Sequence, residues 1–315
     1  MSPDLFRDLF LQVWLPIATL VAAGGLWARF RRDPPADRLR VCLNRLVVDV
    51  FAPPLLFALA AQAHIDRQML TVPVITVAGI LTSLGLLHPL LYRSPLGAGL
   101  ARETRAAILL AGCFGNVLFM GYPVLTFLYG PLGGSYAAFA DVLASTPLVW
   151  TLGVWIATRL GHPGGRGVSL MRTVLRLPPI WGFVLGFAVN FAGIDAAPLI
   201  QAAKFMGQAT IPLMLFTLGL SIPWADLRPS RPVLAAVGVK LAVAPLIVLG
   251  LARLVFGGLQ DAQTAAILEV AMPTMLMAAS LADRFHLDVR AAALTVSWSS
   301  LGFLVTLPLW IALLK

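Results

Sequence analysis

The chain has 315 residues, of which 59% are hydrophobic and only 12% are charged, and its mean hydropathy is +0.88. A soluble domain is about 45–50% apolar and about 25% charged, so these values exclude a typical water-soluble enzyme and a disordered chain. The apolar residues come in blocks rather than in alternation, which argues against a membrane β-barrel. The basic residues behind the net charge of +9 lie between those blocks, so we expect no nucleic-acid partner.

A transmembrane helix needs about 20 apolar residues, so the chain has room for roughly ten crossings and for no sizeable soluble domain. We therefore predict an all-α integral membrane protein, with the lipid bilayer as its surroundings. The first apolar stretch lacks a small-residue cleavage site, so we expect a retained helix rather than a signal peptide. The ten predicted segments, numbered in chain order, are 8–29, 41–63, 68–92, 104–129, 136–159, 176–194, 198–222, 230–254, 262–283 and 289–313.

Most of the 23 Lys and Arg residues lie in the odd-numbered connections between these segments. The other side holds Arg7, Arg67, Lys204, Arg253 and Lys315. Positive residues concentrate on the cytoplasmic side of membrane proteins. This asymmetry places the odd connections in the cytoplasm and both termini outside, and it supports an even number of crossings.

The two halves of the chain share sequence patterns. Segment 2 contains PPLLFALAAQ from Pro53, and segment 7 contains PLMLFTLGLS from Pro212. Segment 5 ends with VWIAT and segment 10 with LWIAL. We predict two five-helix repeats, 1–160 and 176–315, joined by a cytoplasmic connection over 161–175. An odd number of helices inverts the second repeat in the membrane, which is typical of secondary transporters.

Segments 4 and 9 hold helix-breaking residues at membrane depth. Segment 4 contains Gly121 and Pro123 after Asn116, and segment 9 contains Pro273. Interrupted helices at corresponding positions of two repeats indicate a binding site, where freed backbone groups line a cavity. The alternative is a pair of ordinary proline kinks with glycines for close packing. Asn116 is either a substrate contact or an interhelical hydrogen-bond donor.

Lys240 and Glu269 are the ionisable residues that lie deepest in the predicted membrane region. Each costs roughly 2.5–3.5 kcal/mol at the centre of a span if it is unpaired. They form either a structural ion pair or a proton-coupling pair, and Lys240 alone would attract an anion. Asp141 lies about one and a half turns inside segment 5, where it either reaches the interface or takes part in gating or proton relay.

No known catalytic pattern occurs in the chain. It has no nucleotide-binding GxxxxGK[ST] motif and no HExxH motif, and neither Cys42 nor Cys113 has a CxxC partner. We expect no enzymatic activity, no cofactor and no metal centre.

Several of these motifs, taken together, resemble one family over nearly the whole chain. GNVLFMGYPVLTFLYG in segment 4, AMPTMLMAASLADRFHLD in segment 9, IPLMLFTLGLSI in segment 7 and VKLAVAPLI in segment 8 are similar to motifs of the auxin efflux carrier family. The short connection after segment 5 resembles the bacterial form. Ser145 and Asp49 depart from the family pattern, which weakens any transfer of ion-coupling roles.

The resemblance implies the fold of bile acid, arsenite and sodium–proton transporters. Scaffold helices 1, 2, 6 and 7 would then surround transport helices 3–5 and 8–10. The broken fourth and ninth helices would cross at Pro123 and Pro273, beside an anion site. The residues that the resemblance assigns to substrate binding are Asn116, Gly121, Tyr122, Pro123, Met272, Pro273 and Thr274.

We therefore expect an elevator-type secondary transporter in a bacterial inner membrane. Its substrate would be a small organic anion such as malonate or an auxin-like acid, and either a proton or sodium would be the coupling ion. A sodium-coupled symporter is one alternative, with oxygen ligands from Asn116, Thr274 and Glu269. A non-transporting membrane sensor and a channel are the others. A homodimer through scaffold helices 2 and 7 is an expectation from fold analogy alone.

Overall fold

The computed structural model describes residues 3–30, 33–64, 66–161, 176–224 and 227–314. These residues form helices joined by short connections, and their one β-type contact is an isolated bridge between Gly115 and Thr274. Most of the predicted cytoplasmic connection over 161–175, from residue 162 onward, lies outside the described residues. The predicted all-α class is confirmed for the part of the chain that is described.

Seven helices in the described ranges are long and apolar enough to cross a membrane. They are Pro3–Phe30, Ala36–Ala61, Thr71–Tyr92, Pro131–Gly161, Ala197–Ser221, Arg231–Phe256 and Val289–Leu314. They coincide with predicted segments 1, 2, 3, 5, 7, 8 and 10. Segment 6 is shorter, because its helix covers Pro178–Phe191, and segments 4 and 9 are each interrupted.

Several long helices consist of shorter pieces joined by π-helical turns, among them Val47–Phe51, Asp141–Ser145 and Val239–Val243. The pieces in the first five segments are α1 (Pro3–Leu9), α2 (Leu15–Phe30), α3 (Ala36–Leu46), α4 (Ala52–Ala61), α5 (Thr71–Tyr92), α6 (Arg102–Cys113), α7 (Tyr122–Tyr129), α8 (Pro131–Ala140) and α9 (Thr146–Leu148). Those in the last five are α11 (Pro178–Phe191), α12 (Ala197–Gly207), α13 (Thr210–Ser221), α14 (Arg231–Gly238), α15 (Ala244–Phe256), α16 (Asp261–Val270), α17 (Met277–Arg284) and α18 (Val289–Leu314).

Local sequence signals set the helix ends. Gly130 has a φ of +63° and turns the chain sharply between α7 and α8, a conformation that favours glycine. At the start of α16, the Gln260 backbone N–H donates to Gln263 Oε1 at 2.9 Å within a reciprocal capping box. Pro178 begins α11, where a missing N–H costs no helical hydrogen bond.

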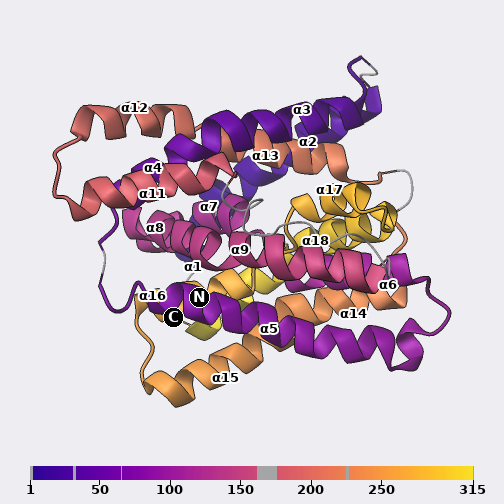
Figure 1. The fold of residues 1–315 in the computed structure, drawn as a ribbon. Helices are drawn as coiled ribbons and strands as arrows, with labels where there is room; N and C mark the ends of the chain where they lie inside the picture. The colour runs from indigo at the N-terminus through magenta and orange to yellow at the C-terminus, as the bar shows by residue number, and fades with distance from the viewer. Residues whose placement is uncertain (1–2, 31–32, 65, 162–175, 225–226, 315) are drawn as a thin grey trace.

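The helices lie roughly side by side across the molecule, and both termini lie toward the same end (Figure 1). We call this the terminus end. In that view α3, α4 and α11–α13 occupy the upper part and α5, α14 and α15 the lower part, with α6–α9 and α16–α18 between them. Buried residues are concentrated in α6 and α16, which form the centre of the core.

Glycines allow two pairs of helices to meet backbone to backbone. A side chain on Gly182 or Gly186 of α11 would overlap the carbonyl oxygen of Pro53 or Phe57 on α4. In the same way, Gly24 of α2 and Gly219 of α13 lie against each other's helices. Small residues at such contacts let membrane helices approach closely, since apolar burial gives little advantage in lipid.

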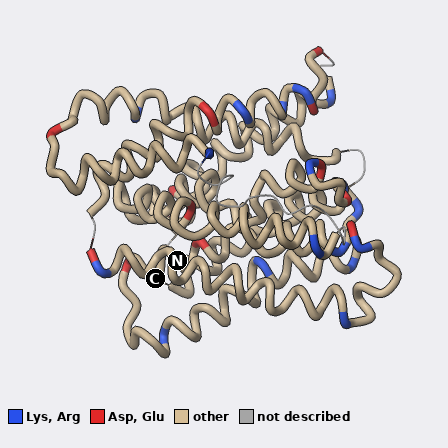
Figure 2. The backbone as a smooth tube through the Cα atoms, in the orientation of Figure 1, with Lys and Arg blue, Asp and Glu red and all other residues tan. Residues whose placement is uncertain are grey.

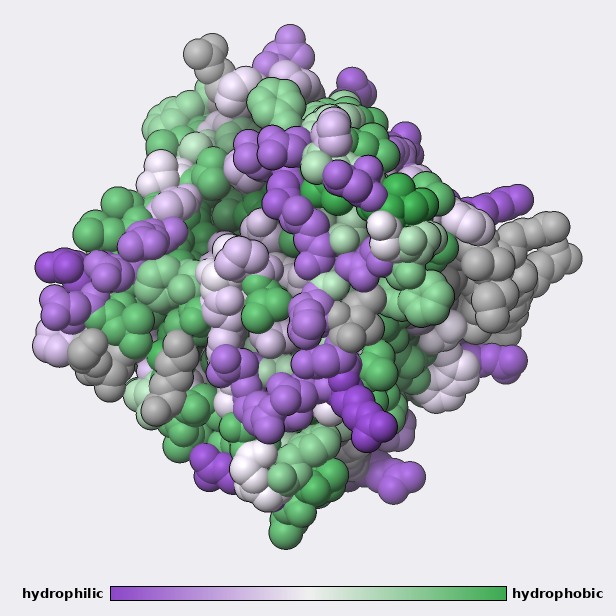
Figure 3. All heavy atoms as spheres, turned by 90° about the vertical axis from the view of Figure 1, so that its left-hand side faces the viewer, coloured by the Kyte–Doolittle hydropathy of each residue, from purple (hydrophilic) through white to green (hydrophobic). Residues whose placement is uncertain are grey.

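Large apolar side chains cover much of the outer surface. Phe191, Phe205 and Leu254 are 85%, 78% and 84% exposed. Figure 3 looks onto the terminus end, where hydrophilic residues gather over the middle and hydrophobic residues surround them. A surface of this kind suits contact with lipid and would be a liability in water.

The cationic side chains gather at the end of the molecule opposite the termini (Figure 2). We call it the arginine-rich end. It comprises the start of α3, the end of α5, the start of α6, the end of α17 and the start of α18, with residues Arg38, Arg40, Arg93, Arg102, Arg105, Arg284 and Arg290. The distribution agrees with the predicted segregation of Lys and Arg to the odd connections.

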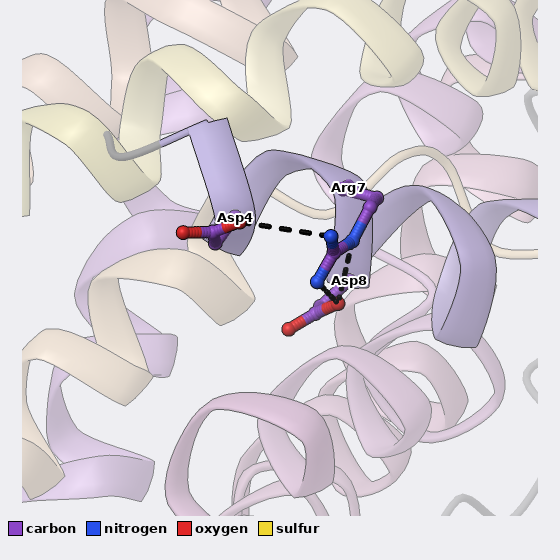
Figure 4. A network of polar contacts seen from close by, with 3 residues as sticks. All are labelled: Asp4, Arg7 and Asp8. Atoms are coloured by element: carbon purple, nitrogen blue, oxygen red, sulfur yellow. Dashed lines mark hydrogen bonds and ion pairs between the residues drawn. The ribbon is translucent and has the colours of Figure 1, made fainter.

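One exposed polar network lies in α1 (Figure 4). Arg7 Nη1 lies 3.7 Å from Asp4 Oδ1, and Arg7 Nε lies 3.5 Å from Asp8 Oδ1. All three side chains are open to solvent, where such pairs are worth about 0–1 kcal/mol. The network neutralises a basic residue at the terminus end and has no direct part in the site described below.

Candidate functional site

Segment 4 is interrupted at Phe114–Asn116. Helix α6 ends at Cys113, Phe114 adopts an extended conformation, and helical structure resumes in the π-helical turn Val117–Gly121. The Asn116 carbonyl oxygen accepts from the N–H groups of Met120 and Gly121, at 3.1 and 3.2 Å, so it begins the second helical stretch. The chain thus exposes backbone groups in the middle of an apolar segment.

Segment 9 is interrupted between Val270, the last residue of α16, and Met277, the first residue of α17. The two interruptions meet through two backbone hydrogen bonds. Asn116 N–H donates to the Pro273 carbonyl at 2.7 Å, and Met275 N–H donates to the Phe114 carbonyl at 3.0 Å. Each broken segment therefore satisfies part of the other's freed backbone, as a low-dielectric interior requires.

The position of the first interruption differs from the one we expected. The resemblance placed the meeting point at Pro123 and Pro273. Pro273 does lie in the second interruption, but Pro123 is the second residue of α7, seven residues after Asn116. The helical stretch that begins at Val117 continues through Pro123 to Tyr129, so Pro123 lies inside that stretch and does not break the segment.

Asn116 lies inside the interruption, and its side chain is only 3% exposed. Its Nδ2 atom is buried and has no hydrogen-bond partner among the described residues. It borders a cavity of about 60 Å³, enough for a few water molecules. The lining residues are Gly115, Asn116, Val117, Leu118, Phe119, Asp141, Ser145, Thr146, Val149, Trp150, Met275, Leu276 and Met277.

Lys240 approaches the same interruption from segment 8. Its Nζ atom donates to the Val270 carbonyl at 2.5 Å, the last carbonyl of α16. Nζ also lies close to Gly115, since a Cβ placed there would be 3.1 Å away. The ammonium group thus satisfies a freed carbonyl and places a positive charge beside the break.

Glu269 is fully buried, and neither of its carboxyl oxygens has a hydrogen-bond partner among the described residues. Among the described residues, Glu269 forms no direct ion pair with Lys240. Its carboxyl group lies directly against Gly121, where any side chain would overlap it. Asp141 begins a π-helical turn, accepts a 3.3 Å hydrogen bond from Thr146 Oγ1 and lines the Asn116 cavity.

A second and larger cavity, of about 550 Å³, is lined by residues of α7 that follow the Val117–Gly121 turn, among them Tyr122 and Pro123. One wall comes from segments 1, 2 and 7, and the other from segments 4 and 5. Its polar lining includes Lys204, Gln12, Gln62 and Gln208, all of them exposed, so the cavity communicates with the surface. We call it the wide cavity.

The predicted substrate-binding residues fall into three places. Asn116 lines the small cavity, whereas Tyr122 and Pro123 line the wide cavity. Gly121 lies against the carboxyl group of Glu269 and lines neither cavity. Pro273 and Thr274 lie in the second interruption, where Thr274 N–H donates to Ser299 Oγ at 3.0 Å and Thr274 Oγ1 has no partner among the described residues. Met272 is buried just before them, and its N–H donates to the Glu269 carbonyl at 3.2 Å.

Some residues of the two cavities were not singled out from the sequence. Thr146 and Trp150 line the small cavity, and Lys204 and Gln208 line the wide one. A usable signal existed for the last two. Lys204, Gln208, Ile211 and Leu215 recur at spacings of three to four residues, which places them on one face of a helical segment.

The comparisons with known proteins agree with a membrane transporter. The profile of a family described as "Membrane transport protein" matches residues 10–162 and 167–311. An "Uncharacterized transporter" of Methanothermobacter thermautotrophicus is 31% identical over 274 residues, which cover 85% of this chain and 87% of that protein. "Uncharacterized transporter YfdV" of Escherichia coli K12 is 22% identical over 314 residues, 96% of each chain. The chain therefore belongs to this family of multi-pass membrane transporters, the auxin efflux carrier family that its motifs resemble.

Proposed function

We propose that the protein is a secondary transporter of a small organic anion, such as malonate or an auxin-like carboxylate. The observation that carries this proposal is the buried Nδ2 group of Asn116, which has no partner among the described residues and borders a cavity at the meeting point of two broken helices. A buried donor without a partner costs about 1–3 kcal/mol, and a carboxylate oxygen would satisfy it.

The charges around the break favour an anion. Lys240 Nζ lies beside Gly115, and the residues that lead into α17, from Met275 to Met277, line the cavity. The first turn of a helix carries a partial positive charge, which stabilises a nearby anion. Two acidic groups, Glu269 and Asp141, would repel a bound anion unless each carries a proton. The site therefore suits a carboxylate best when these two groups are neutral.

The small cavity is too small for a dicarboxylate, so binding requires it to widen. The walls of the wide cavity suggest how. Segments 1, 2 and 7 form one wall and segments 4 and 5 the other, which matches the division into scaffold and transport helices expected from the resemblance. In this proposal the protein has ten helices in two inverted repeats, and the transport helices slide against the scaffold in an elevator motion.

We propose that the coupling ion is a proton and that Glu269 carries it, with Asp141 as a neighbouring relay. Both carboxyl oxygens of Glu269 are buried and unpartnered among the described residues, and a charged carboxylate at membrane depth is costly. The same oxygens, together with Thr274 Oγ1, favour sodium as the second candidate, because oxygen atoms without hydrogen-bond donors can ligate a cation. The arginine-rich end would face the cytoplasm, and both termini the outside of an inner membrane.

The test is uptake of labelled malonate into proteoliposomes, with and without a proton gradient and in the absence of sodium. We expect saturable uptake that follows the gradient. Asn116→Ala should raise the half-saturating concentration at least tenfold and leave thermal stability unchanged. The matched control is Asn44→Ala, because the Asn44 side chain also has a buried unpartnered atom among the described residues but lines neither cavity.

Uptake that is equally affected by both substitutions would remove Asn116 from the binding site. Uptake that requires sodium and does not respond to the proton gradient would identify sodium, rather than the proton, as the coupling ion. If a folded protein transports none of a panel of mono- and dicarboxylates, including aromatic acids, the organic-anion assignment fails.

A further inference from the structure

A groove of about 490 Å³ runs along the outer face of α5, and none of its lining residues lines either of the cavities described above. It is lined by Leu81, Leu84, Gly85, His88, Pro89 and Arg93, together with Trp155 of segment 5. The α5 residues recur every three to four positions, so they form a single stripe on one helix face. The stripe ends at Arg93, where α5 reaches the arginine-rich end.

The body of the groove is apolar and open. Leu81 is 50% exposed and Trp155 is 47% exposed. Gly85 lines the same groove, and a Cβ placed on it would have no heavy atom within 4 Å. The missing side chain leaves a channel between the leucines and the indole ring. Its apolar lining suits a hydrocarbon chain, and its position on the surface of a membrane-spanning helix brings lipid to it.

One end of the groove is basic. Arg93 is exposed and forms no ion pair with any residue in the described ranges. The imidazole of His88 stacks on Tyr92, with ring centroids 5.0 Å apart, and the Arg105 guanidinium lies 5.7 Å from the centroid of the same tyrosine ring. These contacts hold two nitrogen-bearing side chains near the end of the stripe. Arg159 follows Trp155 by four residues and adds a further cation on that segment.

We propose that this groove binds one anionic phospholipid from the leaflet at the arginine-rich end. An acyl chain lies along Leu84, Gly85 and Trp155, and the phosphate group meets Arg93 and His88. The apolar stripe and the basic end stand in the order in which a phospholipid presents its chain and its headgroup. An interfacial tryptophan beside them matches the preference of indole for the headgroup level. The inference does not depend on the substrate proposed above.

The experiment uses the full chain in nanodiscs doped with phosphatidylglycerol or phosphatidylcholine that carries brominated acyl chains, which quench nearby tryptophans. The protein has eight tryptophans, so the Trp155 signal is the difference between the parent and Trp155→Phe. We expect phosphatidylglycerol to quench Trp155 at lower mole fraction than phosphatidylcholine. Arg93→Gln should raise the required fraction about fivefold, the effect of one basic residue near an anionic headgroup.

Two further variants separate the groove from general electrostatics. Gly85→Leu fills the open channel and should abolish the preferential quenching without loss of folding, since a Cβ at this position has no heavy atom within 4 Å. Arg253→Gln removes an exposed arginine near the end of α15, away from the groove, and should leave the preference unchanged. Equal quenching by both lipids, or an equal loss in Arg253→Gln, would overturn the proposal in favour of ordinary annular lipid.

Discussion

Arg40 Nη1 donates a 3.0 Å hydrogen bond to Ser280 Oγ, across 240 positions of the sequence. The bond joins α3 to α17, which the proposed mechanism assigns to the scaffold and to the transport helices. Arg40 Nη2 also lies 3.8 Å from Asp37 Oδ1, so the guanidinium is oriented from its own helix. The two sets of helices are thus in contact near the arginine-rich end, and both contribute to the lining of the wide cavity.

Removing the Ser280 hydroxyl should make this conformation less stable. The hydrogen bond is worth about 1 kcal/mol, which is about fivefold in the population of the conformation that holds it. In Ser280→Ala, we expect slower alkylation of a cysteine placed at Gln208 in the wide cavity, measured with a membrane-impermeant maleimide after Cys42 and Cys113 have been replaced. The reason is that, in the proposed elevator motion, the wide cavity closes when the helices slide.

Ser94→Ala is the control for that measurement. Ser94 also lies at the arginine-rich end, but its hydroxyl donates to the Leu90 carbonyl of its own helix and joins no second segment. An unchanged alkylation rate in Ser280→Ala, or an equal change in Ser94→Ala, would show that the Arg40 contact does not select between conformations.

Asn190 should behave as a structural residue, in contrast to Asn116. Its Nδ2 atom donates to the carbonyls of Ala60, Ala61 and Ala63, at 3.2, 2.9 and 2.8 Å, around the end of α4. The last carbonyls of a helix have no partner of their own. We expect Asn190→Ala to cost about 1–3 kcal/mol of stability. Thermal unfolding in detergent should show a lower Tm, while the half-saturating substrate concentration of the remaining folded protein stays within a factor of two.

Gly121 should tolerate no side chain while Glu269 is present. A methyl group there would overlap both carboxyl oxygens of Glu269, and forced overpacking costs typically 1–3 kcal/mol. We expect Gly121→Ala to lower the Tm and to reduce uptake. The double variant Gly121→Ala, Glu269→Ala should recover the Tm, because the clash disappears. A double variant no more stable than Gly121→Ala would contradict this contact.

Glu269→Gln tests proton coupling without a change of shape. A glutamine has nearly the same volume but takes up no proton. An inward proton gradient drives uptake because protons bind at the acidic outer side and leave at the more alkaline inner side. In Glu269→Gln we expect gradient-driven uptake to fall to the level seen without a gradient, while exchange of labelled for unlabelled substrate continues. Gradient-driven uptake at the parent rate would exclude Glu269 as the proton carrier.

Much of the helical layout could be predicted from composition, because apolar blocks of membrane length have few other structures available. Seven of the ten predicted segments are helices long enough to span a bilayer in the described residues, and segments 4 and 9 were expected to be broken. The location of the first break could not be fixed in this way. Proline and glycine both weaken helices, but the helical stretch Val117–Tyr129 runs through Pro123. The break lies instead at residues 114–116, whose backbone groups find partners in segment 9.

The candidate site was predictable in its residue types but not in its pairings. The sequence identifies Lys240 and Glu269 as ionisable residues deep in the membrane region. It does not decide whether they pair with each other or act separately. Their partners, the Val270 carbonyl and the surface of Gly121, are backbone features that leave no mark in the sequence. The lining of the wide cavity comes from segments 1, 2, 4, 5 and 7, so only the fold brings Lys204 and Tyr122 to the same cavity.

The hydrogen bonds between the two breaks also constrain how the protein is synthesised. Residues 114–116 enter the membrane long before residues 273–275 have been translated, yet each stretch holds the other's backbone partners. Until then, the Asn116 N–H and the Phe114 carbonyl lack these partners, so segment 4 cannot take its final conformation before segment 9 has been inserted. Release of the first half from the insertion machinery should therefore wait for the arrival of segment 9, and a chain truncated before it should be recognised as defective and degraded.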